Sequence, residues 1–493
     1  LLKGGQIGEK MPKTRWILAL LGVVTLAGGY ILALKADNVL TGLNTFFVAV
    51  LLVIVGTFAL FTAGSIAFLK MLQRNKRYYY KTNHFISISG MIYRMKQNAA
   101  SLSLICIMST GVLLLISSTT SLYVGQEHSL YLRYPKEFKL SLSLGEVPDD
   151  SKTFEKELKE IGTYAEDYLK DNKIATQNAA GQTVIEAAAL QKDGNVQITS
   201  SRNGSSEDFS DLCMVQAITL EDYNREAKKD ETLEDREALV FLEDVPLQQD
   251  TFSVNNMKWK VKHLPEDTRM GDTGLEFYAN PVYRIVVKDF AQLQELWKIN
   301  KEVYRENASR VKYEYSFDVD LPEEKIQKLT SSLHAYFGEQ KDAPHAFFYG
   351  IETRTEGRAE FYSLYGGLFF LGIFLGLLFV MATVLIIYYK QISEGYEDKE
   401  RFAILKKIGM ERGEINASIR SQVLMVFFLP LAAAGIHSCF AFHLVKEILV
   451  GGFGLQDVGL LVICAVLTFL AFAVFYVIVY LITAREYYKI VSE

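Results

Sequence analysis

Six stretches of this 493-residue chain contain no Asp, Glu, Lys or Arg and are long enough to cross a lipid bilayer. Crossing the hydrocarbon core takes about 20 consecutive apolar residues in a helix. Uncharged stretches of this number and length predict a polytopic membrane protein rather than a water-soluble one. The predicted transmembrane helices cover residues 16–34, 45–69, 100–124, 361–389, 421–445 and 458–484.

The charge is divided unequally between two parts of the chain. Of its 57 acidic and 52 basic residues, 45 and 30 lie between Gly125 and Glu360, so this segment has a net charge of −15 and the remainder +10. The division indicates an acidic, water-exposed domain attached to a basic membrane part. It excludes a nucleic-acid-binding protein, because such a protein needs a basic surface to neutralise phosphates.

Basic residues in the short loops predict the orientation in the membrane. The loop 70–99 carries seven Lys and Arg and no acidic residue, so it is predicted to face the cytoplasm, as are both ends of the chain. Six crossings then place residues 125–360 outside the cell. The predicted localisation is the plasma membrane, with both ends cytoplasmic and residues 125–360 extracellular.

The 236 residues between the third and fourth predicted spans are enough for a domain. Alternating or continuous apolar runs predict strands, and apolar spacing of three and four predicts a helix. Together they predict one large α+β domain whose strand order stays open. The predicted strands are 137–144, 238–242, 252–261 and 283–287, the predicted helix is 154–171, and strand-then-helix patterns cover 283–299 and 313–337.

Two predicted cytoplasmic segments combine helical apolar spacing with basic residues. Residues 86–95 precede the third span, and Glu397–Gly409 follow the fourth, with Gly409 as the C-terminal cap. Each predicts an amphipathic helix at the membrane surface. Four domains are therefore predicted. Residues 1–99 hold two transmembrane helices and a basic loop with an amphipathic helix, and residues 100–124 form a stalk helix. Residues 125–360 form the extracellular domain, and residues 361–493 form a second membrane domain that includes helix 397–409.

Motifs for bond chemistry are absent from the sequence. It has no phosphate-binding GxxxxGK[ST] loop, no HExxH and no GxSxG. The seven His are scattered, and the four Cys lack metal-binding spacing. The chain is predicted to be a non-catalytic membrane subunit with no cofactor or metal of its own. Its uncharged spans also disfavour an ion-coupled transporter, which keeps charged groups in the membrane, and Gly372 and Gly376 form a GxxxG pattern that predicts close helix packing.

The segment Glu400–Met410, ERFAILKKIGM, resembles the signature that follows the second stalk helix in FtsX-like permeases. In that family a charged pair leads into an apolar core, followed by Leu-x-x-Leu/Ile-Gly, and this loop contacts the ATPase of an ABC complex. The resemblance implies that the ATPase-coupling residues here are Arg401, Phe402, Leu405, Lys406, Gly409 and Met410.

A second segment, Ile88–Ala99, ISGMIYRMKQNA, leads into Ile107–Thr110 and is similar to the region before the stalk in bacitracin-export-type (Bce-type) permeases. Those proteins have ten spans, and this chain matches the last six, so the first four are expected to be missing from this sequence. The similarity implies a membrane-interface helix that includes Met91, Tyr93, Arg94, Lys96 and Asn98.

These resemblances imply a permease subunit of a mechanotransmitting ABC complex that senses cell-wall-targeting antimicrobial peptides and confers resistance to them, in a Gram-positive bacterium. The peptides would be of the bacitracin or lantibiotic class. ATP and Mg would bind to a separate ABC ATPase, expected in two copies. The other expected partners are the antimicrobial peptide or its lipid-linked wall precursor, a sensor histidine kinase and membrane lipid.

The acidic outer segment has two open interpretations. Its charge of −15 could attract cationic peptides over a distance, or it could serve solubility alone. Three other functions also stay open. They are an FtsX-like regulator of extracellular wall hydrolases, whose family usually has four spans and a smaller outer domain, a lipoprotein-release permease, and a membrane-tethered enzyme.

Overall fold

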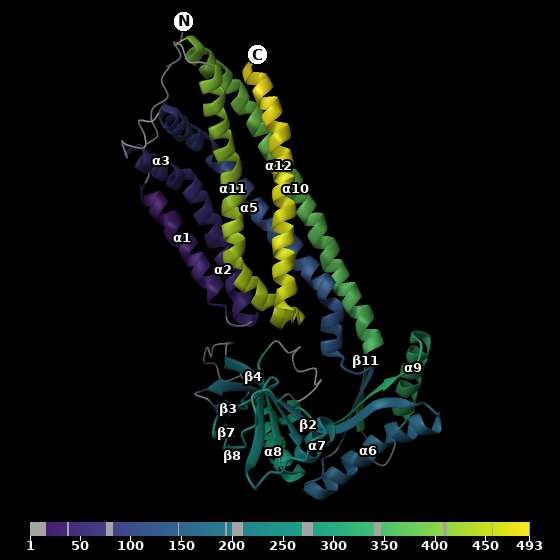
Figure 1. Ribbon diagram of the computed structural model, residues 1–493. Coiled ribbons are helices and arrows are strands. Elements are labelled where there is room, and N and C mark those ends of the chain that lie inside the picture. Colours follow the sequence, from purple (N-terminus) through teal and green to yellow (C-terminus); the bar gives the residue numbers. More distant parts are fainter. Residues whose placement is uncertain are drawn as a thin grey trace.

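The protein consists of a bundle of long helices with a separate region of sheet and shorter helices at one end (Figure 1). The computed structural model describes residues 16–36, 39–74, 82–145, 147–192, 195–199, 211–268, 280–339, 347–407, 412–455 and 457–492. Within them, six helices are long and apolar enough to cross a membrane, and each predicted span overlaps one of them. The fold is that of a polytopic membrane protein, as predicted.

The bundle consists of the helices in the first and last parts of the described chain. The second span changes its hydrogen-bonding pattern near its middle, where a π-helical turn, Leu60–Gly64, joins two α-helices. The helices are α1 (Trp16–Leu34), α2 (Val39–Ala59), α3 (Ser65–Arg74), α5 (Thr82–Arg133), α10 (Arg354–Lys407), α11 (Arg412–Phe453) and α12 (Val458–Ser492).

Helices α5 and α10 are much longer than their uncharged stretches. The predicted amphipathic segment 86–95 is continuous with the stalk helix in α5, and residues 397–407 are continuous with the fourth span in α10. The structure therefore differs from the prediction of two separate surface helices. The physical reason is that neither helix contains a proline, so nothing interrupts the hydrogen-bond ladder where the apolar stretch gives way to charged residues.

The sheet region lies between α5 and α10 in the chain. It mixes strands and helices, as the α+β prediction requires. Its elements are β1 (Phe138–Leu144), α6 (Ser151–Asp171), β2 (Thr176–Lys192), β3 (Asn195–Gln197), β4 (Leu212–Thr219), α7 (Leu220–Ala227), β5 (Glu237–Leu242), β6 (Val245–Pro246), β7 (Thr251–Val254), β8 (Met257–Val261), β9 (Val282–Val287), α8 (Phe290–Tyr304), β10 (Lys312–Val319), α9 (Glu323–Glu339) and β11 (Phe347–Thr353).

The strands form one sheet that closes on itself and then extends to one side. Following the pairing from β2 through β3, β7, β8, β5, β9 and β4 leads back to β2, which also pairs with β4. From β2 the sheet continues through β10 and β1 to β11, which is the last strand of the order. The two strands at this end, β1 and β11, are therefore the ones next in the chain to the long helices α5 and α10.

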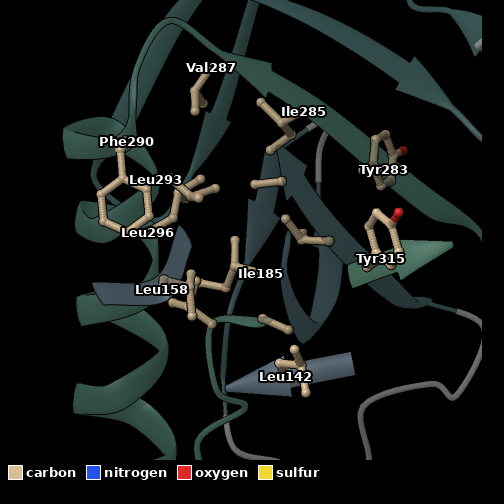
Figure 2. Close-up of a cluster of buried hydrophobic side chains, with 14 of the residues drawn as sticks. Leu142, Leu158, Ile185, Tyr283, Ile285, Val287, Phe290, Leu293, Leu296 and Tyr315 are labelled. Atoms are coloured by element: carbon tan, nitrogen blue, oxygen red, sulfur yellow. The ribbon is translucent and has the colours of Figure 1, made fainter. Parts of the chain in front are cut away.

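Apolar side chains from one face of the sheet and from helices α6, α8 and α9 form the main core. Figure 2 shows Leu293 and Leu296 of α8 beside Ile185 of β2 and Ile285 of β9. At the β1–β10 pair, Phe138 and Phe317 stack with their ring centres 4.9 Å apart, and neither side chain reaches the surface. This core fixes the strands to which the long helices connect.

Most of the predicted elements of this region are confirmed, with one difference. Strands at 137–144, 238–242 and 283–287 and the helix at 154–171 are present as β1, β5, β9 and α6. The predicted strand 252–261 is instead a hairpin of β7 and β8. Asn255 at its turn has a φ of 50°, a conformation that asparagine tolerates better than most residues.

Candidate functional site

The two longest helices of the described chain, α5 and α10, run side by side through the bundle and continue directly into adjacent strands; we call this pair the stalk (Figure 1). Helix α10 begins at Arg354, the residue after β11, and four residues lie between the end of α5 and the start of β1. Strands β1 and β11 pair along seven residues, from Phe138 opposite Thr353 to Leu144 opposite Phe347. A movement of the stalk therefore reaches the sheet through two paired strands.

Small residues let the stalk helices approach closely, as the GxxxG pattern predicts. A Cβ atom added to Gly376 of α10 would lie only 2.9 Å from Ile116 of α5, and one added to Gly111 of α5 would lie 3.2 Å from Phe379. Real Cβ atoms rarely tolerate such distances, so these positions need glycine. Small residues at such positions are what allows two membrane helices to pack closely.

Where the stalk meets the sheet, Arg354 connects the two helices; we call the segment Tyr134–Glu137 together with Thr353–Thr355 the domain junction. The Nε of Arg354 donates to the Tyr134 carbonyl oxygen at 2.7 Å, and its Nη2 donates to the carbonyl oxygen of Pro135. The same Nη2 lies 3.7 Å from a carboxylate oxygen of Asp318 on β10. Only 14% of the Arg354 side chain is exposed, so these bonds are largely protected from water.

Glu137 completes the domain junction from the opposite side. Its Oε1 accepts hydrogen bonds from the backbone N–H of Thr355 at 3.0 Å and from the Thr355 hydroxyl at 2.7 Å. The backbone N–H of Arg354 donates to the Glu137 carbonyl oxygen at 2.9 Å. A carboxylate at a helix N-terminus satisfies free N–H groups and complements the helix dipole. The start of α10 is therefore capped by the chain segment that follows α5.

The turn between α11 and α12 holds the same end of the stalk. The Ser129 hydroxyl of α5 donates to the Gly454 carbonyl oxygen at 2.8 Å, and the Tyr365 hydroxyl of α10 donates to the Phe453 carbonyl oxygen at 2.7 Å. Leu455, in the same turn, is 1% exposed. Both stalk helices are thus attached to the rest of the bundle where they leave it.

At the other end of the stalk, buried and partly buried polar side chains lie between the helices. We call the group Asn98, Ser101, Lys390, Glu394, Asp398 and Tyr487 the distal polar cluster. The Asn98 amide of α5 donates to Glu394 of α10. Lys390 donates to the Ser101 hydroxyl at 2.8 Å and lies 3.7 Å from Glu394. Buried charges are tolerated only when they are paired and hydrogen-bonded, so this group fixes how the two helices lie relative to each other.

The last helix joins the distal polar cluster through one hydrogen bond. The Tyr487 hydroxyl of α12 donates to Asp398 Oδ2 of α10 at 2.5 Å, and both side chains are buried. Three helices therefore meet one turn before the segment that resembles the ATPase-contacting loop.

The predicted site residues lie beside this cluster or beyond it. Asn98 is buried in the cluster. Met91, Tyr93, Arg94 and Lys96 lie on α5, and Arg401, Phe402, Leu405 and Lys406 lie on the last part of α10; the side chains of these eight lie outside the part of the chain that the structure describes. Gly409 and Met410 lie outside the described residues altogether. The coupling assignment therefore stays a prediction.

Sequence analysis missed Lys390, Glu394, Asp398 and Tyr487. A signal for three of them was present, because Lys390, Glu394 and Asp398 recur every four residues and so occupy one face of a helix. They directly follow an uncharged span, where a row of charges on one face indicates contact with another helix. Their partners could not be read from spacing, because Asn98 and Tyr487 are distant in sequence.

These groups attach the stalk helices to each other, to α12 and to the sheet region. In the described ranges, no group of three or more His, Cys, Asp or Glu is placed to hold a metal ion. The charged groups at both ends of the stalk bond to backbone groups or to polar side chains.

Comparisons with known proteins agree with the resemblances in sequence. Residues 368–491 match the model of the FtsX-like permease C-terminal family. The chain is 26% identical over 454 residues to the ABC transporter permease protein YxdM of Bacillus subtilis, covering 90% of this chain and 64% of that protein. It is 23% identical over 431 residues to the bacitracin export permease protein BceB of Halalkalibacterium halodurans, covering 86% and 62%, and 22% identical over 447 residues to BceB of Bacillus subtilis, covering 88% and 63%. The chain spans less than two thirds of the length of each of these three relatives. It thus carries an FtsX-like permease domain and is similar to ABC transporter permeases, bacitracin export permeases among them.

Proposed function

We propose that this protein is the permease subunit of an ABC complex that senses wall-directed antimicrobial peptides and protects the cell from them. Its stalk would carry movement, driven by ATP hydrolysis on a separate chain, to the sheet region outside the cell. The observation that carries the proposal is the unbroken path from the distal polar cluster through α5 and α10 to the paired strands β1 and β11.

The location of each part supports this division of work. The loop between α3 and α5 is rich in Lys and Arg, which supports a cytoplasmic location for that end of the bundle. The sheet region lies at the opposite end of the bundle and is strongly acidic, so we place it outside the cell (Figure 1). The relatives in Bacillus subtilis favour a Gram-positive source, and two relatives named bacitracin export permease favour peptides of the bacitracin or lantibiotic class.

The ATPase contact is proposed at the end of α10 and just beyond it. Arg401, Phe402, Leu405 and Lys406 lie within the last two turns of α10, directly after the distal polar cluster, and Gly409 and Met410 follow in sequence. ATP and Mg would bind to the partner, in two copies. Met91, Tyr93, Arg94 and Lys96 would face the cytoplasmic membrane surface, and a sensor histidine kinase would be a further partner.

The test is growth inhibition by a panel of wall-directed peptides, bacitracin and lantibiotics included. Cells carrying the complete permease gene and its ATPase are compared with cells whose ATPase cannot hydrolyse ATP. We expect protection against at least one peptide, and we expect it to vanish with the inactive ATPase. No protection against any peptide, with the permease detected in the membrane, would refute the proposal and favour regulation of extracellular wall hydrolases or lipoprotein release.

A second experiment compares two variants to test whether the attachment of the stalk to the sheet region is needed for protection. Arg354→Ala breaks the domain junction, whereas Arg358→Ala, one turn later in α10, removes an exposed pair with Glu127 and a contact with Tyr131. We expect Arg354→Ala to lose protection while the ATPase still binds, and Arg358→Ala to keep it. Equal protection by both variants would contradict the role of the stalk.

A further inference from the structure

The second span contains one residue more than a continuous α-helix of its length would hold. In its π-helical turn, Leu60–Gly64, the backbone N–H of Ser65 donates to the Leu60 carbonyl oxygen, five residues earlier. In an α-helix it would donate to the Phe61 carbonyl oxygen, four residues earlier. Single π-helical turns inside α-helices frequently mark functional sites, and nothing in the proposed function uses this one.

The sequence satisfies the carbonyl group that the π-helical turn leaves over. The Phe61 carbonyl oxygen does not receive the Ser65 N–H, but it accepts a hydrogen bond from the Ser65 hydroxyl at 2.6 Å. Without that bond, a polar group would stay unpaired inside a membrane span, which is costly. A Cβ atom added to Gly64 would lie 2.8 Å from Leu60 Cδ2, so the turn also needs glycine there. Ser65 and Gly64 therefore both support the π-helical form.

The turn lies where the second span changes its packing partner. Before the turn, α2 packs mainly along α1. After it, Leu69 of α3 belongs to the same buried cluster as Ile92 and Met95, near the start of the stalk helix α5. The part of the span that contacts the stalk is therefore separated from the rest by the extra residue.

Helix α3 has apolar side chains for two different orientations. If the turn became α-helical, α3 would rotate by about 100°, and each of its residues would take the place now held by the next one. Phe68 would then replace Leu69, and Met71 would replace Leu72. At present Leu69 is buried and Leu72 partly buried, whereas Phe68 and Met71 are 56% and 57% exposed. Both orientations thus place large apolar side chains against the stalk.

The π-helical form leaves one polar atom unsatisfied. Thr62 Oγ1 is buried and has no hydrogen-bond partner among the described residues. Elsewhere in this span, the hydroxyls of Thr45 and Thr57 donate to the carbonyl oxygens four residues earlier, at 2.7 and 2.6 Å. An α-helical turn would offer the Phe58 carbonyl oxygen to Thr62 in the same way. The π-helical form thus gains the bond of Ser65 and lacks that of Thr62, which keeps the two forms close in free energy.

We propose that the π-helical turn is a two-position switch. It interconverts with an α-helical turn, and α3 rotates against the stalk as it does so. Movement of the stalk at Met95 would select between Leu69 and Phe68 as its neighbour. The switch needs neither the ATPase nor the peptide of the proposed function, so the two proposals can fail separately.

Cysteine cross-linking distinguishes the two positions. The full chain is placed in phosphatidylcholine vesicles and carries Met95→Cys together with either Leu69→Cys or Phe68→Cys. A short bismaleimide joins the cysteines, and mass spectrometry of the linked peptides measures the yield. We expect position 69 to link to position 95 in high yield, because these side chains share a cluster. Position 68 should link in lower yield, from the α-helical form.

A matched pair of serine variants tests what holds the π-helical form. Ser65→Ala leaves the Phe61 carbonyl oxygen unpaired in that form only, so the yield at position 68 relative to position 69 should rise by roughly tenfold. Ser438→Ala is the control, because its hydroxyl donates to the Ala434 carbonyl oxygen at 2.9 Å within α11. It should leave the ratio unchanged.

Deletion of Thr62 removes the extra residue and so makes the span continuous with α3 in its present orientation. We expect the link from position 69 to remain and the link from position 68 to disappear. A link from position 68 that persists in the deletion variant would mean that Phe68 reaches the stalk without rotation, and loss of the link from position 69 would mean that the extra residue does not set the orientation of α3. An unchanged ratio in Ser65→Ala, or an equal rise in Ser438→Ala, would also overturn the proposal.

Discussion

Replacing Arg354 by alanine should loosen the domain junction by an amount that can be worked out from its contacts. The guanidinium donates to two backbone carbonyl oxygens, and hydrogen bonds from a charged group contribute about 1.5–3 kcal/mol each. Water that enters the vacated site would return part of that energy. We therefore expect the local opening free energy of the junction to fall by about 2–4 kcal/mol.

Hydrogen exchange followed by mass spectrometry measures this local opening. The reporting amides are Glu137 N–H, which donates to Asp318 Oδ1 at 2.9 Å, Arg354 N–H, which donates to the Glu137 carbonyl oxygen, and Thr355 N–H. A change of about 2–4 kcal/mol predicts exchange about 30- to 900-fold faster in Arg354→Ala, since each 1.36 kcal/mol is tenfold.

The control is Arg358→Ala on the same helix. Arg358 and Glu127 are 44% and 43% exposed and 3.4 Å apart, and exposed pairs contribute about 0–1 kcal/mol. Exchange at the three reporting amides should therefore rise by no more than about fivefold. If the two variants accelerate exchange equally, the assignment of Arg354 as the residue that closes the junction is refuted.

Four further predictions concern other parts of the chain. Phe317→Ala should lower the stability of the sheet region by about 3–5 kcal/mol, because it empties a fully buried site, and tryptophan fluorescence during denaturation would measure this. Tyr487→Phe should lower bundle stability by about 1.5–3 kcal/mol in thermal unfolding, because it removes the hydrogen bond to a buried carboxylate; an unchanged midpoint would contradict this. Leu405→Asp should abolish peptide resistance and binding of the ATPase while membrane insertion, assayed by fractionation, is kept. Burial alone raises the pKa of Glu186, but Lys312 and Lys139 outweigh burial and leave that pKa below its ordinary value. The ionised Glu186 should therefore stabilise the fold above its unfolded-state pKa, and this stabilisation should be lost as the pH falls through its folded-state pKa. The difference in stability between the unchanged protein and Glu186→Gln should accordingly shrink in acid.

The parts of the fold that the sequence predicts are those set by local pattern. The membrane spans need only an absence of charge, and β1 and α6 have the alternation and the helical spacing of half-buried elements. Strand β2 escaped prediction although it has 17 residues, because Ala, Gln and Gly181 give it little strand propensity. It is a strand because β10 and β4 pair with its two edges, and this is decided by tertiary structure.

The candidate site was predictable in its position along the chain but not in its contacts. Asn98 was identified from its place in a family-like segment, yet its partner Glu394 lies 296 residues away. The domain junction was missed for the same reason, because Arg354 and Tyr134 are 220 residues apart and neither belongs to a recognisable motif. Only folding brings the two ends of the acidic segment together.

The pairing of β1 with β11 restricts the kind of motion that the stalk can deliver. If α10 slid lengthwise past α5, the seven residue pairs between these strands would have to break, and a shift of one residue would turn every side chain of one strand to the wrong face. If both helices rise, tilt or rotate as one body, those pairs stay intact. The sheet region would then move as a rigid body with the two helices. A sliding motion of α5 against α10 would not be passed on to it.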